Sequence, residues 1–178
     1  MVITETSLKG AFVIELEPFT DVRGFFARAW SEREFADFGL NSRFVETNIS
    51  FNEKKGTLRG MHYQLPPHEQ AKLVRCTRGS IYDVIIDLRP ESPTFKQWFP
   101  LEMSAENRLM LFVPAKFAHG FQTLEDQTEV TYQTSAYYAP EHGRGVRWND
   151  PAFNISWPLS GPNLTMIDRD LNYEDFVA

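Results

Sequence analysis

The sequence predicts an all-β protein with a few short helices, built as a sandwich or small barrel in a single domain. Short apolar runs follow one another at strand spacing, and Gly, Pro, Asn or Asp separates most of them. Aromatic residues make up 14% of the 178 residues, with 15 Phe, and aromatic side chains favour strands. Because no repeat or linker interrupts the pattern, we expect one domain over residues 1–178.

Ten runs are expected to form strands. They are AFVIEL (11–16), GFFARAW (24–30), RFVETNIS (43–50), LRGMHYQ (58–64), KLVRC (72–76), SIYDVIIDL (80–88), QWFPLEM (97–103), LMLFVP (109–114), HGFQTL (119–124) and EVTYQTSAYY (129–138). Both alternating faces of the run 80–88 are largely apolar, which predicts a strand between two layers. In the last run, Tyr132 shares a face with Val130, and we expect that face to point inward.

One helix is expected within this pattern. Ser31 stands at the cap position of SEREFADFG, Glu34 follows three residues later as in a capping box, and Gly39 ends the segment. The final stretch, residues 164–176, is polar and lacks a sustained period, which predicts a short helix or irregular tail.

The stretch TLRGMHYQLPPHEQAKLVRC, residues 57–76, resembles two paired strands joined by a proline-rich turn. The segment 59–78 carries four cations and one acid, Glu69, although the formal net charge of the chain is −6. An acidic chain does not suit nucleic acid, whereas a local basic pocket suits a small anionic ligand. A solvated charged strand face is the alternative interpretation.

The histidines raise the question of a base or a metal site. His62 lies near Arg59 and Lys72, which favours a role as general base over that of an isolated structural histidine. Cupin-type barrels often bind a metal through His-x-His, but here His62 and His68 are six residues apart and His119 is distant. We therefore expect no metal.

Several other classes are disfavoured. The single cysteine, Cys76, allows no intramolecular disulfide, which favours a reducing compartment. No basic leader or apolar stretch of about 20 residues is present, so we expect a cytoplasmic protein without a membrane partner. The sequence has no nucleophile elbow, which disfavours nucleophilic catalysis. It has no phosphate loop or dinucleotide fingerprint, which predicts no redox cofactor.

Eight collinear blocks between residues 12 and 173 resemble the dTDP-4-dehydrorhamnose 3,5-epimerase family. The blocks are DVRGFF, LRGMHYQ, KLVRC, DLRPESPTF, VPAKFAHGFQTL, EVTYQTSAYYAPE, RWNDP and IDRD. The resemblance implies a cupin-type jelly roll that acts as a homodimer without metal or cofactor. It implies epimerisation at C3 and C5 of a nucleotide-linked 4-keto-6-deoxyhexose, most simply a dTDP-sugar.

The resemblance also implies roles for the residues of the unusual stretch. His62 matches the base, Tyr132 the acid, and Lys72 the cation near the oxyanion that forms when a proton next to the C4 ketone is removed. Asp170 matches the carboxylate that orients the histidine. We prefer it to Asp168, because Arg169 then matches the basic residue that precedes the family aspartate.

The remaining matches describe a nucleotide clamp. The expected substrate contacts are Arg23 (supplied across the dimer interface), Arg28, Glu46 (in place of a more usual glutamine), Asn48, Arg59, His119, Tyr138 (stacking on the base) and Arg169. At two positions, Arg28 and Gly143, many family members carry a glutamate, and these departures leave a CDP-linked or other nucleotide sugar open.

Three alternatives stay beside the double epimerase. A C3-only or C5-only enzyme would use the same base, since the outcome depends on pocket shape. A cupin that binds a sugar nucleotide without turnover and a metal-dependent cupin enzyme are the others.

Overall fold

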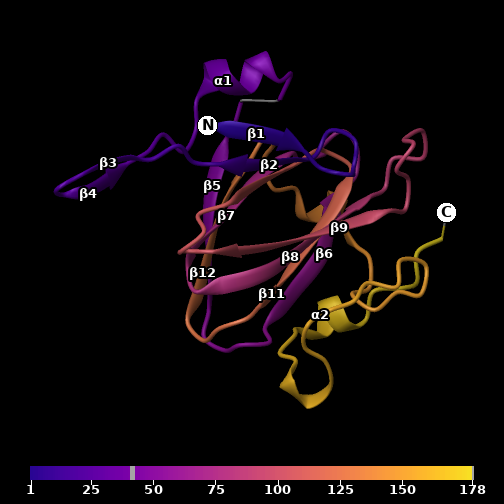
Figure 1. The fold of residues 1–178 in the computed structure, drawn as a ribbon. Helices are drawn as coiled ribbons and strands as arrows, with labels where there is room; N and C mark the ends of the chain where they lie inside the picture. The colour runs from indigo at the N-terminus through magenta and orange to yellow at the C-terminus, as the bar shows by residue number, and fades with distance from the viewer. Residues whose placement is uncertain (41–42, 178) are drawn as a thin grey trace.

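The computed structural model describes residues 1–40 and 43–177, which fold into two antiparallel β-sheets packed face to face (Figure 1). One sheet has the order β1-β2-β10-β7-β12-β5, the other β13-β6-β11-β8-β9, and β3-β4 forms a separate hairpin. The strands are β1 Val2–Glu5, β2 Phe12–Glu15, β3 Phe19–Asp21, β4 Gly24–Phe26, β5 Glu46–Asn52, β6 Leu58–Gln64, β7 Lys72–Arg78, β8 Ser80–Asp87, β9 Trp98–Ser104, β10 Met110–Val113, β11 Phe117–Thr123, β12 Thr128–Thr134 and β13 Gly143–Gly145. The all-β prediction is confirmed, and the arrangement is a cupin-type jelly roll.

The main core lies between the two sheets. Val74 of β7 and Leu111 of β10 are fully buried there against Ile85 of β8. On the outer face of β8, Val84 and Ile86 are buried in a second cluster. The strand is thus apolar on both faces because it lies between two packed layers, as its sequence predicts.

The expected pairing of the two strands in residues 57–76 is wrong. β6 belongs to the five-stranded sheet and β7 to the six-stranded sheet, so the proline-rich segment 65–71 crosses from one sheet to the other. Arg59 of β6 and Lys72 of β7 therefore line the space between the two sheets from opposite sides, whereas Arg75 and Arg78 do not line it.

Helix α1, Glu32–Asp37, begins where the sequence predicts. The Ser31 hydroxyl accepts the backbone N–H of Glu34 at 3.4 Å. The Glu34 carboxylate does not accept the Ser31 backbone N–H, as it would in a full capping box. It binds the Met1 ammonium at 3.0 Å and Arg28 at 3.3 Å instead. The helix is held on the sandwich by Phe35, which is fully buried and meets the Phe112 ring edge-on at 6.2 Å.

The predicted strand 24–30 is shorter than expected. Only Gly24–Phe26 is extended, and it pairs with β3 in a hairpin that projects from the sandwich (Figure 1). We call residues 19–26 the arm. Its side chains are exposed, and the Arg108 guanidinium lies over the Phe25 ring at 4.6 Å from the ring centroid.

The C-terminal region runs along the outside of the five-stranded sheet. It contains helix α2, Asp168–Leu171, and the 3₁₀ turn η2, Gly161–Asn163, while a further turn η1, Pro140–His142, precedes β13. No helix within residues 1–40 and 43–177 is long and apolar enough to cross a bilayer.

A close backbone approach aligns the strands that carry the candidate residues. A Cβ at Gly60 of β6 would lie 2.6 Å from the Cα of Gly120 in β11, and Gly60 has φ of +151°. Only glycine fits both demands. The two strands therefore meet tightly, and His62 is placed opposite His119 in the register.

Candidate active site

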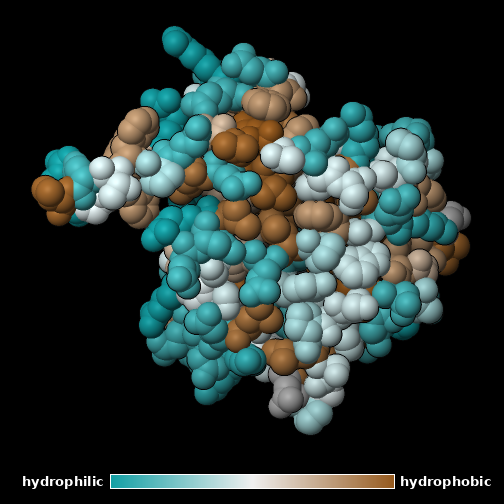
Figure 2. Space-filling view, in the orientation of Figure 1, coloured by the Kyte–Doolittle hydropathy of each residue, from teal (hydrophilic) through white to brown (hydrophobic). Residues whose placement is uncertain are grey.

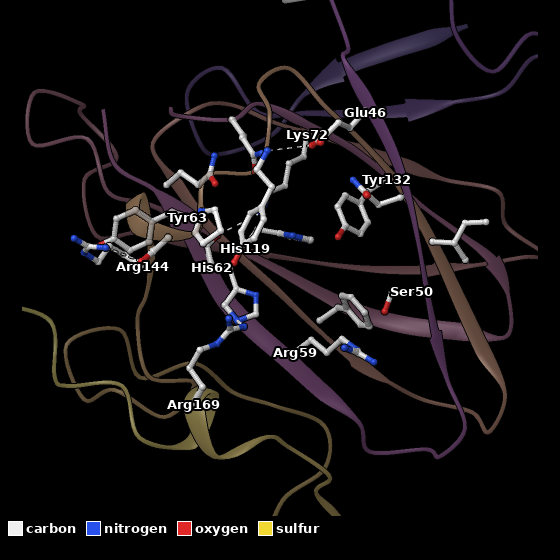
Figure 3. A pocket seen from close by; sticks show the side chains of 18 of the residues that line it. Glu46, Ser50, Arg59, His62, Tyr63, Lys72, His119, Tyr132, Arg144 and Arg169 are labelled. Atoms are coloured by element: carbon white, nitrogen blue, oxygen red, sulfur yellow. Dashed lines mark hydrogen bonds between the residues drawn. The ribbon is translucent and has the colours of Figure 1, made fainter. Parts of the chain in front are cut away.

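A cavity of about 910 Å³ opens between the two sheets (Figure 3). It receives side chains from β5, β7 and β12 on one side and from β6 and β11 on the other, with α2 at its edge. Nine of the predicted site residues line it: Glu46, Asn48, Arg59, His62, Lys72, His119, Tyr132, Tyr138 and Arg169.

His62 forms a dyad with Asp170. The His62 Nε2 lies 2.8 Å from Oδ1 of Asp170, which is 1% exposed and also accepts the Gly60 N–H. A carboxylate can only accept, so Nε2 carries the proton, and Nδ1 is left as the acceptor. The Arg169 guanidinium lies 3.3 Å from the same Nε2, but this contact is not a hydrogen bond, because both nitrogens are donors.

The electrostatics favour a neutral imidazole beside an ionised carboxylate. Burial lowers the pKa of His62, and Asp170 offsets part of that shift. Burial opposes ionisation of Asp170, but the interactions with His62, the Gly60 N–H and Arg169 together outweigh it and lower the pKa of Asp170. The His62 ring is thus held in one tautomer and available to accept a proton near neutral pH.

We expect Asp170→Asn to reduce kcat by about 10²-fold or more, because the ring loses the partner that fixes its tautomer. Since Asp170 raises the pKa of His62, its removal should move the acid limb of the kcat/KM profile to lower pH. A pH–rate profile checks this. A limb that stays in place or moves upward would contradict the assigned pair.

A second His–Asp pair lies deeper in the cavity, and no role for its acid was predicted from the sequence. His119 Nε2 is 2.8 Å from Oδ2 of Asp83, which is fully buried. Burial raises the pKa of Asp83, and interactions with His119 and Lys72 oppose part of that rise. The sequence signal that could have indicated this pair is the position of Asp83, a carboxylate on the otherwise apolar inward face of the run 80–88.

Lys72 supplies a buried positive charge from the opposite sheet. Its Nζ donates to the backbone carbonyl of His62 at 3.4 Å. Burial lowers the Lys72 pKa to about 8, and the nearby Asp83 carboxylate limits that fall. The ammonium is therefore positioned at the cavity wall near the dyad, with few groups to neutralise it.

Tyr132 enters the cavity from β12. In Figure 3 its ring lies across the hollow from His62, with Lys72 at the upper end. The inward orientation predicted from Val130 is confirmed, since Tyr132 packs against the main core. Burial raises its pKa, while Arg59 opposes the shift. The phenol is thus a proton donor at neutral pH.

Polar groups on β5 and β6 extend the cavity toward solvent. The Glu46 carboxylate accepts the Tyr138 N–H at 3.2 Å, and Tyr138 itself is 60% exposed at the rim. Arg59 donates through Nε to the Asn52 side-chain oxygen at 2.7 Å, and this hydrogen bond fixes the position of its guanidinium. Asn48 lies opposite Tyr132 in the β5–β12 register.

Arg23 and Arg28 lie outside the cavity of their own chain. Arg23 is on the arm, bound to Asp21, with its side chain 85% exposed. Arg28 pairs with Glu34 near α1. Neither residue reaches the dyad within one chain, and their predicted contacts with substrate stay predictions.

Four further cavity residues were not predicted from the sequence. The Tyr173 ring meets His62 edge-on at 6.1 Å and covers Gly145, where an added Cβ would clash with it. Tyr63, Gln70 and Arg144 also line the wall. Tyr173 lies in an irregular tail and Arg144 in a three-residue strand, so no periodic pattern marks them.

Comparison with known proteins gives a family for this fold and cavity. Residues 5–177 match the family model of dTDP-4-dehydrorhamnose 3,5-epimerase. The chain belongs to the dTDP-4-dehydrorhamnose 3,5-epimerase family. A family member from Shigella flexneri is 41% identical over 178 residues, which span 99% of this chain and 97% of the relative.

Several solved structures superpose closely on this chain. The enzyme from Elizabethkingia anophelis has a TM-score of 0.96 at 38% identity, covering 99% of this chain and 96% of that one. The Bacillus anthracis enzyme, with TDP and pyrophosphate bound, has a TM-score of 0.93 at 40% identity, covering 98% and 99%. A 3′-monoepimerase from Streptomyces bikiniensis, in complex with dTDP-quinovose, has a TM-score of 0.85 at 32% identity, covering 97% and 86%.

Proposed function

We propose that this chain inverts C3 and C5 of a dTDP-linked 4-keto-6-deoxyhexose, as in the conversion of dTDP-4-dehydro-6-deoxy-D-glucose to dTDP-4-dehydro-L-rhamnose. The observation that carries the proposal is a His62–Asp170 dyad and a Tyr132 phenol on opposite walls of one cavity, with a buried Lys72 ammonium between the sheets. Family membership and a TDP-bound relative support the dTDP-sugar.

The first step is removal of a proton from a carbon next to the C4 ketone. His62 Nδ1 accepts this proton, because its Nε2–H is already held by Asp170. The C–H electron pair moves into a C–C double bond, and the carbonyl electron pair moves to the C4 oxygen. The imidazolium that forms is stabilised by the adjacent carboxylate.

Lys72 stabilises the enolate oxygen that results. A fixed ammonium at the cavity wall lowers the free energy of the developing negative charge by several kcal/mol. The His119 ring, anchored on Asp83, supplies a second polar group in the same region.

Tyr132 then returns a proton from the opposite face of the sugar ring. Its O–H bond breaks as the new C–H bond forms, and the enolate collapses to the ketone with inverted configuration. His62 finishes protonated and Tyr132 deprotonated, so solvent resets both before the next carbon reacts. The same sequence at C5 and C3 gives double epimerisation.

The nucleotide is held at the outer part of the cavity. Arg59 has a guanidinium suited to the diphosphate, since its fork can make parallel hydrogen bonds to two oxygens. Tyr138 offers an exposed ring for stacking on the base, and Asn48 and Glu46 offer polar contacts. A nucleotide sugar also fits the cytoplasmic location that the sequence predicts.

A homodimer would explain why the arm exposes apolar side chains. Phe19 and Phe26 of the arm are 75% and 70% exposed, and Ile49 of the edge strand β5 is 68% exposed. Figure 2 shows apolar atoms along the arm at the left of the molecule. Such groups are stabilised when a second copy covers them, and an arm that crosses the interface would bring Arg23 to the neighbouring cavity.

Replacing Arg23 with alanine should therefore raise KM for the nucleotide sugar by about 10- to 100-fold with a smaller change in kcat, since one charged hydrogen bond is lost. Arg33→Ala, on the exposed surface of α1, is the matched control. Steady-state kinetics and sedimentation of both variants check this. An unchanged KM, or a monomeric wild type, would refute the proposal that Arg23 contacts substrate in the neighbouring cavity.

A C3-only epimerase is the second candidate, because a 3′-monoepimerase shares this fold. The deciding assay incubates the enzyme with dTDP- or CDP-4-keto-6-deoxyglucose, traps the product with a reductase and identifies it by NMR. We expect the L-rhamnose configuration from the dTDP-sugar. A product inverted at C3 alone would support the second candidate, and no product from either sugar would refute the proposed function.

A further inference from the structure

Outside the active-site cavity, one group of side chains within residues 1–40 and 43–177 brings metal-binding atoms together. His68, Glu141 and His142 each offer one ligand atom, and these atoms all lie within 4.8 Å of one another. The two imidazole rings are 4.4 Å apart between centroids. None of the three residues lines the cavity, so the cluster is separate from the dyad and from the buried lysine.

The backbone around the cluster is fixed by hydrogen bonds between two segments far apart in sequence. Leu65 N–H donates to the His142 carbonyl at 3.0 Å, and the His68 N–H donates to Leu65 at 2.9 Å. The buried Gln64 amide donates to the His68 carbonyl at 2.7 Å and accepts the Ala139 N–H at 2.7 Å. Both histidines are thus positioned by the fold before any ligand binds.

The side chains of the cluster remain available. Arg144, the nearest cation in sequence, donates to the backbone carbonyls of Glu141 and Gly143 at 3.0 and 2.8 Å. Its guanidinium is thereby occupied by backbone oxygens. Within the described part of the chain, the Glu141 carboxylate has no hydrogen bond or ion pair, so it can serve a cation.

We propose that His68, Glu141 and His142 form a binding site for a late first-row divalent cation such as Zn²⁺. Two imidazoles and one carboxylate are the donors these ions prefer, whereas Mg²⁺ and Ca²⁺ require oxygen ligands. Ligands around a tetrahedral Zn²⁺ are roughly 3.4 Å apart, given bonds of about 2.1 Å, so side-chain rotation closes the remaining gap. The fourth position is left to water.

A bound cation would join the segment after β6 to the turn before β13. Gln64 and Gly143, which flank the cluster, line the cavity wall. The site therefore braces that wall without taking part in proton transfer, and the cation should stabilise the fold while the chemistry proceeds without it.

The test titrates Zn²⁺ into the tag-free protein by calorimetry and follows thermal unfolding. We expect one equivalent to bind and the melting temperature to rise by about 3–6 °C at tenfold excess over Kd, with no such rise in Mg²⁺. The double variant His68→Ala/His142→Ala should lose this binding, and Glu141→Gln should weaken it by about tenfold. Glu69→Gln, adjacent to His68, is the matched control and should bind as the wild type does.

A further variant separates this cluster from the active site. His62→Asn should keep the full equivalent of Zn²⁺, because His62 is not a ligand of the proposed site. Retained binding in the double alanine variant, or lost binding in His62→Asn, would overturn the proposal. Epimerase activity of the double variant verifies that it folds, so a loss of binding is interpretable.

Discussion

His62→Ala should lower kcat by about 10³-fold while leaving affinity for dTDP unchanged. The loss follows because the cavity would retain its nucleotide contacts but lack the group that accepts the first proton. Among the described residues, His62 is the one imidazole that combines a carboxylate partner from α2 with a position opposite Tyr132 in the cavity. The measurement compares steady-state turnover with dTDP binding by calorimetry.

The matched control for this variant is His68→Ala, which removes an imidazole outside the cavity. Its turnover should equal that of the wild type. If His62→Ala kept most of its activity, the base would be another group. If the wild type bound dTDP without turnover, the chain would be a sugar-nucleotide-binding module instead of an enzyme.

Lys72→Met should lower kcat by about 10²- to 10³-fold, the cost of losing one group that stabilises an oxyanion. Methionine has a similar length and fills the same space, so the cavity keeps its shape. The KM should change less than kcat, since the charge on the C4 oxygen develops only as the proton leaves. A variant with normal kcat would show that Lys72 does not contact the enolate.

The same variant should change how stability depends on pH. Burial lowers the Lys72 pKa to about 8 in the folded chain, from an ordinary lysine value of 10.5. Between these values the unfolded chain holds a proton that the folded chain releases, so this group makes stability rise with pH. The urea midpoint of Lys72→Met should lack that rise relative to the wild type. An identical pH dependence would contradict a buried ammonium.

The fold was predictable where the sequence has strong local signals. The run 80–88 indicated a strand between two layers, and Ser31 indicated the start of α1, because both patterns arise from neighbours along the chain. The pairing of β6 with β7 was predicted wrongly for the opposite reason. A proline-rich connection of seven residues serves a hairpin or a crossing between sheets equally well, and only distant strands decide between them.

The site was predictable through the family resemblance more than through spacing. His62 and Asp170 are 108 residues apart, and no periodicity connects them. Asp83 stood on an apolar face in the sequence, yet its partner His119 comes from another strand. Arg23 cannot be placed from one chain, because its predicted contact requires a second copy.

The most direct test of the central claim is turnover in D₂O with mass and NMR analysis of the sugar. A single base and a facing acid, both exchanging with solvent, should leave one deuteron at C3 and one at C5 of the product. The same label should be absent with His62→Ala. Product formed without solvent deuterium at either carbon would contradict proton transfer by His62 and Tyr132.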